Sequence, residues 1–168
     1  RAYYFTLNGI LVSFGGAANS ELAENCTDET ALLAAYTTVV DRFSLDRIDF
    51  DIEGAAVSNA TANQRRARVV AQLQKAYAAK GRSLEVSLTL PVMPYGLVAS
   101  GLRTAKEFAA AGVAVTQVNV MAMDYGDSAA PNPQGRMGDY AIQAATSLFN
   151  QLKSVYGTSK SDDDLWAM

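Results

Sequence analysis

Histidine is absent from the 168 residues, and cysteine occurs only once, at Cys26. Without histidine the sequence cannot supply Ser-His-Asp or Cys-His catalysis, nor a histidine-ligated zinc. A single cysteine cannot form a disulfide within the sequence. Any hydrolytic chemistry encoded here must therefore use carboxylates, hydroxyls or the substrate itself.

Long apolar runs and an excess of positive charge are also missing. No run of about 18 apolar residues occurs, so the sequence encodes no membrane-spanning helix. The net charge of −3 offers no basic field for nucleic acid or for an anionic membrane. The first residues, 1–9, do not follow the pattern of a signal peptide. We therefore expect a globular protein without nucleic-acid or membrane partners.

Short apolar runs alternate with segments of helical periodicity. Strands are expected at 10–14, 47–52, 84–90 (ended by Pro91) and 115–123, with the start of another at 165–168. Helices are expected at about 27–43, 61–80, 102–111 and 137–156, the last burying Ala141, Ala145, Leu148, Leu152 and Val155. This alternation predicts an α/β domain over 1–168 with a parallel sheet, either an open doubly wound sheet or a (β/α)₈ barrel.

The length of the chain bears on the choice between these folds. A (β/α)₈ barrel needs about 250 residues, and this sequence supplies about five strands. An unclosed barrel would expose two sheet edges, which is unfavourable in water. We therefore expect the chain to be part of a larger protein.

Acidic residues occupy alternate positions along the strand expected at 47–52. Asp49, Asp51 and Glu53 share one face, because side chains in a strand alternate between its two sides. Neighbouring carboxylates do not all ionise easily, so at least one should have a raised pKa. A carboxyl that holds its proton near neutral pH can act as a general acid. A calcium or magnesium site, or a solvated acidic strand end, remains possible from spacing alone.

Three motifs in order resemble those of family-18 glycoside hydrolases, the chitinases and their relatives. Asp46-x-x-Asp49-x-Asp51-x-Glu53 is similar to the signature of that family. Ser13-Phe14-Gly15-Gly16 resembles its Ser-x-Gly-Gly on the preceding strand. Met121-Ala122-Met123-Asp124-Tyr125 resembles its Met-x-Tyr-Asp strand end. The resemblance implies a (β/α)₈ TIM barrel, with this chain covering about five β-α units from the third strand to the start of the seventh.

The resemblance also implies roles for the acids. Glu53 would protonate the glycosidic oxygen and later activate water. Asp51 would hold the N-acetyl nitrogen of the substrate while its acetamido oxygen attacks the anomeric carbon. Asp49 and Ser13 would lie beneath Asp51 and tune its charge, and Asp46 would be structural. No cofactor or metal is implied.

One position departs from the motif of the family. Met123 stands where the family has Tyr, and Tyr125, two residues on, could supply the hydroxyl that contacts the acetamido group. Asp124 matches the Asp of the family. Met121 and Met123 could equally be barrel core. Tyr95 could line the cleft or pack within its loop.

The function implied is retaining, substrate-assisted hydrolysis of β-1,4 bonds in chitin or N-acetylglucosamine oligomers, favouring endo action. The resemblance further implies a monomeric, extracellular enzyme. A chitinase-like lectin, an endo-β-N-acetylglucosaminidase acting on N-glycans, and a fragment without activity are the alternatives. Non-catalytic relatives usually lose the acid, so the presence of Glu53 favours an enzyme.

Overall fold

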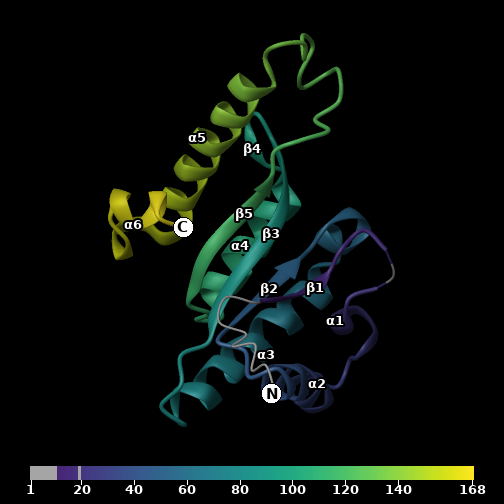
Figure 1. The fold of residues 1–168 in the computed structure, drawn as a ribbon, viewed down its shortest axis with the longest axis vertical. Coiled ribbons are helices and arrows are strands. Elements are labelled where there is room, and N and C mark those ends of the chain that lie inside the picture. The colour runs from purple at the N-terminus through teal and green to yellow at the C-terminus, as the bar shows by residue number, and fades with distance from the viewer. Residues whose placement is uncertain (1–10, 19) are drawn as a thin grey trace, which may run out of the picture.

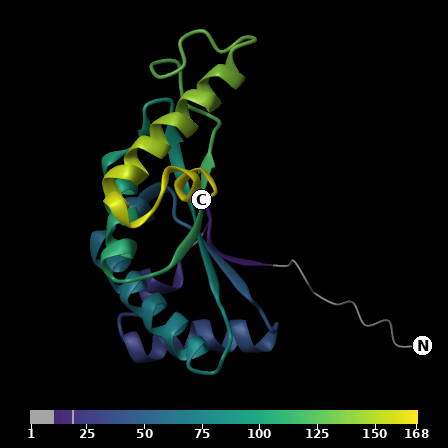
Figure 2. The ribbon, with the colours of Figure 1, turned by 90° about the vertical axis from the view of Figure 1, so that its left-hand side faces the viewer.

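A parallel sheet with helices gathered on one side makes up the chain (Figures 1 and 2). The computed structural model describes residues 11–18 and 20–168, so Ile10 of the first expected strand lies outside the described residues. None of the helices in this described part is both long and apolar enough to cross a membrane.

The elements follow the predicted alternation. The strands are β1 Val12–Gly15, β2 Arg47–Asp51, β3 Glu85–Met93, β4 Gly96–Leu97 and β5 Val115–Met121. The α-helices are α1 Leu22–Asn25, α2 Glu29–Arg42, α3 Ala60–Ala78, α4 Ala99–Ala110, α5 Met137–Tyr156 and α6 Asp162–Trp166. Two 3₁₀ turns, η1 Gly54–Ser58 and η2 Gly157–Ser159, follow β2 and α5.

The order of the parallel strands is the order of the chain. β1 pairs with β2, β2 with β3, and β3 with β5, all in parallel, while β4 folds back on β3 as an antiparallel hairpin. A doubly wound sheet reverses strand order at its centre, whereas a (β/α)₈ barrel adds strands one after another. The observed order is therefore that of a barrel segment.

The two faces of the sheet differ in polarity. On the helix-covered face, Phe50 packs between the rings of Phe14, Tyr36 and Phe108, with ring centroids 5.5, 5.4 and 6.0 Å away. Phe50, Tyr36 and Phe108 are fully buried. The opposite face carries the alternate residues of the same strands, which include hydroxyl, amide and carboxyl groups. The helix-covered face thus forms the hydrophobic core, and the opposite face carries the polar side chains.

Several predicted strand ends are wrong, including that of the fourth strand, which ends at Met121 rather than at residue 123. The third strand does not end at Pro91 but continues to Met93, because Pro91 lies at the last register pair with β5, where a missing N–H matters little. The strand expected at 165–168 is not formed: its first two residues belong to the helix α6, which begins at Asp162 because Ser161 and Asp164 make a reciprocal capping box. Just beyond α6, the carbonyl of Met168 accepts a hydrogen bond of 2.7 Å from the N–H of Val118 on β5.

The buried stripe of α5 is also displaced from the predicted one. Its buried residues are Tyr140, Ala144, Leu148 and Leu152, so the first half of the stripe lies one residue earlier than Ala141 and Ala145. The ring of Tyr140 packs edge-on against Tyr125, 6.4 Å between centroids. This aromatic contact joins α5 to the loop that follows β5.

Candidate active site

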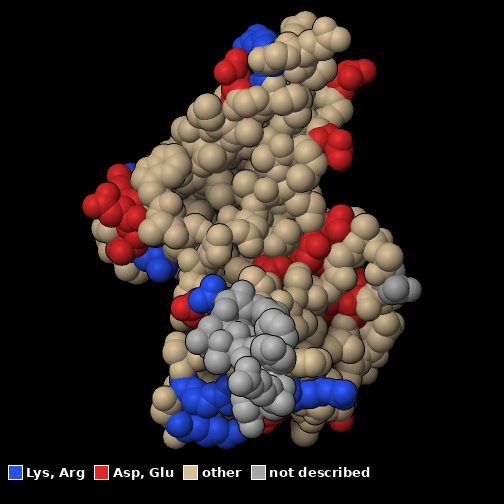
Figure 3. Space-filling view, in the orientation of Figure 1, with Lys and Arg blue, Asp and Glu red and all other residues tan. Residues whose placement is uncertain are grey.

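A row of acids lies on the open face at the carboxyl end of β2. Asp49 and Asp51 belong to the strand, and Glu53 follows directly before η1. Ile48, Phe50 and Ile52, the residues in between, are buried on the helix side. Acidic side chains gather over the middle of the open face (Figure 3). Active sites of (β/α)₈ barrels lie at the carboxyl ends of the strands, which is where this row ends.

Asp49 is the most buried acid of the row, with 3% of its surface exposed. Its carboxylate accepts hydrogen bonds from Ser13 Oγ at 2.6 Å, Ser87 Oγ at 2.6 Å and Thr89 Oγ1 at 3.0 Å. These hydroxyls come from β1 and β3, the strands on either side. Three neutral donors thus satisfy a carboxylate that would otherwise be costly to bury.

Asp51 has no such partners. Its Oδ1 atom is buried and has no hydrogen-bond partner among the described residues. Burial, followed by the charges of Glu53 and Asp49, raises the pKa of Asp51 above its ordinary value of 3.8. The raised pKa expected somewhere in the row therefore falls on its middle member.

Glu53 is half-buried and ends the row. Its backbone is extended, and the next residue, Gly54, has a φ of +55° that turns the chain into η1. The N–H of Ala56 in that turn donates a hydrogen bond of 3.1 Å to the carbonyl of Glu53. The position of the Glu53 backbone is thus tied to η1.

Gly15 and Gly16 lie against the backbone of Asp51. Gly15 has a φ of +117°, and a Cβ at this position would lie 2.0 Å from the carbonyl oxygen of Asp51. The same oxygen accepts a hydrogen bond of 3.0 Å from the N–H of Gly16. Only glycine allows this close approach, so the turn fixes the position of the Asp51 backbone relative to β1.

The end of β5 supplies the remaining predicted residues. Met121 is half-buried, whereas Met123 and Asp124 are exposed, and Asp124 adopts a φ of +51°. Tyr125 is 4% exposed, burial raises its pKa, and its hydroxyl has no partner among the described residues. Asp124 and Tyr125 line a small cavity of about 180 Å³ within the loop.

Tyr95 lies at the turn between β3 and β4 and is 65% exposed. The hairpin and the loop after β5 both rise above the carboxyl end of the sheet (Figure 1). The interpretation that Tyr95 packs within its loop is therefore wrong. Its side chain faces solvent on this side of the molecule.

Sequence reasoning missed the polar residues of β3 and β5 on the open face. Ser87 and Thr89 donate to Asp49, and Asn119 Nδ2 lies 3.4 Å from Thr89 Oγ1. The signal was present: hydroxyl residues at alternate positions of an otherwise apolar strand indicate a face that is not core. These residues extend the site from β1 across to β5.

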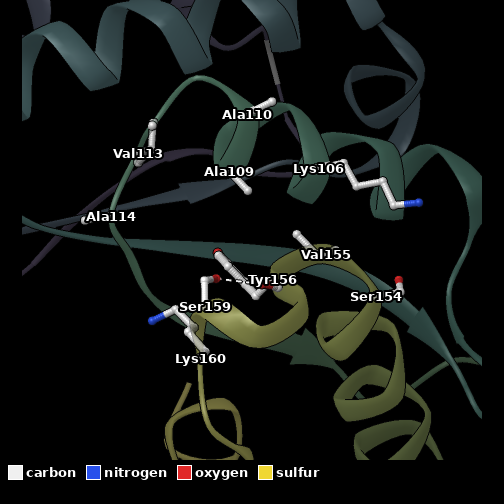
Figure 4. A pocket seen from close by; sticks show the side chains of 11 residues that line it. Lys106, Ala109, Ala110, Val113, Ala114, Ser154, Val155, Tyr156, Ser159 and Lys160 are labelled. Atoms are coloured by element: carbon white, nitrogen blue, oxygen red, sulfur yellow. Dashed lines mark hydrogen bonds between the residues drawn. The ribbon is translucent and has the colours of Figure 1, made fainter.

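A cavity of about 620 Å³ lies elsewhere, between the ends of α4 and α5 (Figure 4). It is lined mainly by small and apolar side chains, together with Lys106, Tyr156 and Lys160. It contains none of the acids of the row and is separate from the candidate site.

Curated relatives of the chain are proteins named as chitinases. The chain is 36% identical over 163 residues to a probable bifunctional chitinase/lysozyme of Escherichia coli and to endochitinase 11 of Metarhizium anisopliae. Each match covers 95% of this chain but only 18% and 31% of the two relatives. No protein-family model matches the chain.

Two solved structures from Pyrococcus furiosus share the fold. The catalytic domain of a hyperthermophilic chitinase superimposes with a TM-score of 0.76 at 29% identity. Active domain 2 of a thermostable chitinase, solved with catalytic-site mutations and chito-oligosaccharides, gives 0.77 at 28%. Each match covers 93% of this chain and 47% or 46% of the solved chain. These likenesses confirm the resemblance to chitinases and the barrel-type α/β fold that the motifs predict.

Proposed function

We propose that the chain carries the acids of a glycoside hydrolase that cleaves chitin, because it is similar to chitinases in sequence and in fold. The bond cleaved is the β-1,4 linkage between N-acetylglucosamine units, and cleavage within the polymer is favoured. The protein acts outside the cell, as a monomer and without a cofactor. This proposal rests on the likeness of the chain to chitinases and on the acid row of β2.

One observation carries the mechanism: the buried Oδ1 of Asp51 has no partner among the described residues while Glu53 lies beside it. A buried acceptor without a donor is unfavourable. The amide N–H of a 2-acetamido sugar is a donor of the right kind. With that donor bound, the acetamido oxygen is directed toward the anomeric carbon of its own ring.

Cleavage then proceeds in two steps without an enzyme nucleophile, a route that glycosidases use as an exception to the two-carboxylate scheme. In the first, Glu53 donates its proton to the glycosidic oxygen, the bond from that oxygen to the anomeric carbon breaks, and the acetamido oxygen bonds to the same carbon. The resulting oxazolinium ion is positively charged and is stabilised by Asp51. In the second, Glu53 takes a proton from a water molecule whose oxygen bonds to the anomeric carbon, and the bond from that carbon to the acetamido oxygen breaks. Two inversions give net retention.

The substitution Glu53→Gln tests this role. The amide cannot donate the proton, so kcat for a chito-oligosaccharide should fall about 10²- to 10⁴-fold while oligosaccharide binding is kept. Turnover in the full-length protein is measured by product chromatography and binding by calorimetry. Normal turnover of this variant would remove the proposed mechanism.

The acetamido group gives an independent test. A substrate whose acetyl groups have been removed lacks the attacking oxygen, so a glucosamine oligomer should bind but not be cleaved. Proton spectra recorded during early turnover of the acetylated oligomer should show the β-anomer as first product. Cleavage of the deacetylated oligomer at a similar rate would instead favour an enzymic nucleophile.

The alternatives separate in the same assays. A lectin would bind chito-oligosaccharides without turnover in the unaltered protein. An enzyme specific for N-glycans would release glycan from a high-mannose glycoprotein and leave chitin oligomers intact. Cleavage of chitin in preference to the glycoprotein is the result that the proposal requires.

A further inference from the structure

A buried ion pair lies behind the acid row, between helices rather than on the open face. Arg66 of α3 and Glu21, which caps α1, are 0% and 3% exposed, and Nη2 of Arg66 lies 2.6 Å from Oε2 of Glu21. Nε of Arg66 donates to the same oxygen at 3.0 Å. Glu21 also accepts from the N–H of Ala23 at 2.7 Å and from the hydroxyl of Tyr36. Such a pair is costly to bury unless its hydrogen bonds are satisfied.

Arg66 also fixes the orientation of Asn63. Its Nη1 donates to the side-chain oxygen of Asn63, so the amide NH₂ of Asn63 must face the other way. That NH₂ lies 3.2 Å from the carbonyl of Ala56, 3.1 Å from the carbonyl of Val57 and 3.1 Å from Thr104 Oγ1. Asn63 is fully buried, so no solvent competes for these contacts.

The two carbonyls belong to η1, the turn that directly follows Glu53. Ala56 in turn donates its N–H to the carbonyl of Glu53. A continuous set of hydrogen bonds therefore runs from Arg66 through Asn63 and η1 to the Glu53 backbone. At its other end, Glu21 lies in the segment that follows the glycine turn of β1. The network thus joins the segments that come after β1 and β2.

We propose that Arg66 and Asn63 are positioning residues for Glu53, and this inference rests on the proposed role of Glu53 as proton donor. A proton donor must lie within hydrogen-bond reach of the leaving oxygen, so a small displacement of the donor lowers the rate of cleavage strongly. Arg66 orients the amide of Asn63, and that amide holds η1 and with it the carboxyl group that is to reach the glycosidic oxygen.

The test uses Asn63→Asp in the full-length protein. This change keeps the oxygen that accepts from Arg66 and replaces the NH₂ with an oxygen that faces two backbone carbonyls. Gln74→Glu, at a half-buried position, is the control. Gln74 is on the same helix, and its amide NH₂ lies 2.9 and 3.1 Å from the carbonyls of Leu84 and Ala114 at the opposite end of the sheet. Both changes thus set a carboxyl oxygen against two carbonyls.

The two substrates compared differ in leaving group. The leaving group of a chito-oligosaccharide is a sugar hydroxyl, which needs the proton of the acid. The leaving group of a 2,4-dinitrophenyl chitobioside is a stable phenolate anion, which does not. For Asn63→Asp, we expect kcat to fall about 10- to 100-fold on the oligosaccharide and less than about 3-fold on the aryl glycoside, because only the first needs a well-placed donor. KM for both should change little. Gln74→Glu should leave both kcat values unchanged.

An equal loss on both substrates, or a loss matched by Gln74→Glu, would overturn the inference, because general destabilisation does not distinguish leaving groups. If Asn63→Asp does not fold, Asn63→Ser removes the donor without opposing oxygens, and the same selectivity decides. Glu53→Gln is measured in parallel. Normal turnover in that variant defeats the proposed function itself, whereas its loss together with an unselective Asn63→Asp defeats only the positioning role.

Discussion

Asp51 is the residue whose protonation the fold alters most clearly within the acid row. Its pKa is raised, so between 3.8 and the raised value the folded chain binds more protons than the unfolded chain. The stability contributed by this group is present below pH 3.8 and is lost as the pH rises through the raised pKa. Asp51→Asn does not titrate, so its stability relative to the unaltered protein should increase as the pH rises above 4.

Urea unfolding at several values from pH 3 to 8 measures this difference, with Asp46→Asn, an exposed acid just before the same strand, as the control. A difference for Asp51→Asn that stays constant or shrinks with rising pH would contradict the assignment. The same variant should lose turnover, because an amide stabilises the oxazolinium ion less well than a carboxylate does.

Gly15 offers a second test at the residue scale. Gly15→Ala sets a methyl group against the Asp51 carbonyl in a conformation that L-residues avoid, so we expect destabilisation of about 3 kcal/mol and a loss of kcat in the fraction that still folds. Gly112→Ala is the control, since Gly112 has a φ of +81° but nothing within 4 Å of the added carbon. Similar losses in the two variants would show that the contact with Asp51 is unimportant.

Single residues also show how far the sequence alone reaches. Alternation along β2 was enough to place Asp49, Asp51 and Glu53 on one face. It could not show that Asp49 takes three hydroxyl donors while Asp51 has none, because that depends on the register of β1 and β3 against β2. The part played by Asn63 was equally hidden, since an asparagine in a helical pattern looks like a solvated residue until its partners are known.

Among the elements, β2 depends on the aromatic cluster behind it. Phe50 is fully buried between three other rings, so Phe50→Ala should destabilise the fold by about 3–5 kcal/mol. Phe43→Ala, which removes a ring that is 45% exposed, should cost less than about 1 kcal/mol. Denaturant midpoints of the two variants measure the contrast. Equal losses of stability in the two variants would mean that the aromatic cluster does not stabilise β2, the strand that holds the acids.

Long periodic elements were predicted well, and short ones were not. The helices α2, α3 and α5 have apolar residues at regular helical spacing, and many of these residues are buried in the structure. In contrast, η1, α1 and α6 have five residues or fewer, too few to show a period. β4 and the residues of β3 beyond Pro91 pair as a hairpin that is too short to show an alternating pattern in the sequence.

At the scale of the whole molecule, the two outer strands of the parallel sheet each have a neighbouring strand on one side only, within the described residues. Within residues 11–18 and 20–168, β1 pairs only with β2, and β5 pairs along its length only with β3. Unpaired strand edges and half a barrel interior favour association. We therefore expect the 168-residue chain to self-associate at micromolar concentration. Light scattering coupled to size exclusion measures its molar mass in solution, and a stable monomer would refute this.

The agreement of strand order with chain order has a consequence for how the molecule is made. Each parallel strand joins the one that was synthesised about 30 to 40 residues earlier, as the pairs Val12–Ile48 and Ile48–Val86 illustrate. Contacts between near neighbours along the chain form quickly, and a nascent chain leaves the ribosome from its amino end. The acid row can therefore be flanked by β1 and β3, and its carboxylate at Asp49 supplied with donors, before translation reaches β5.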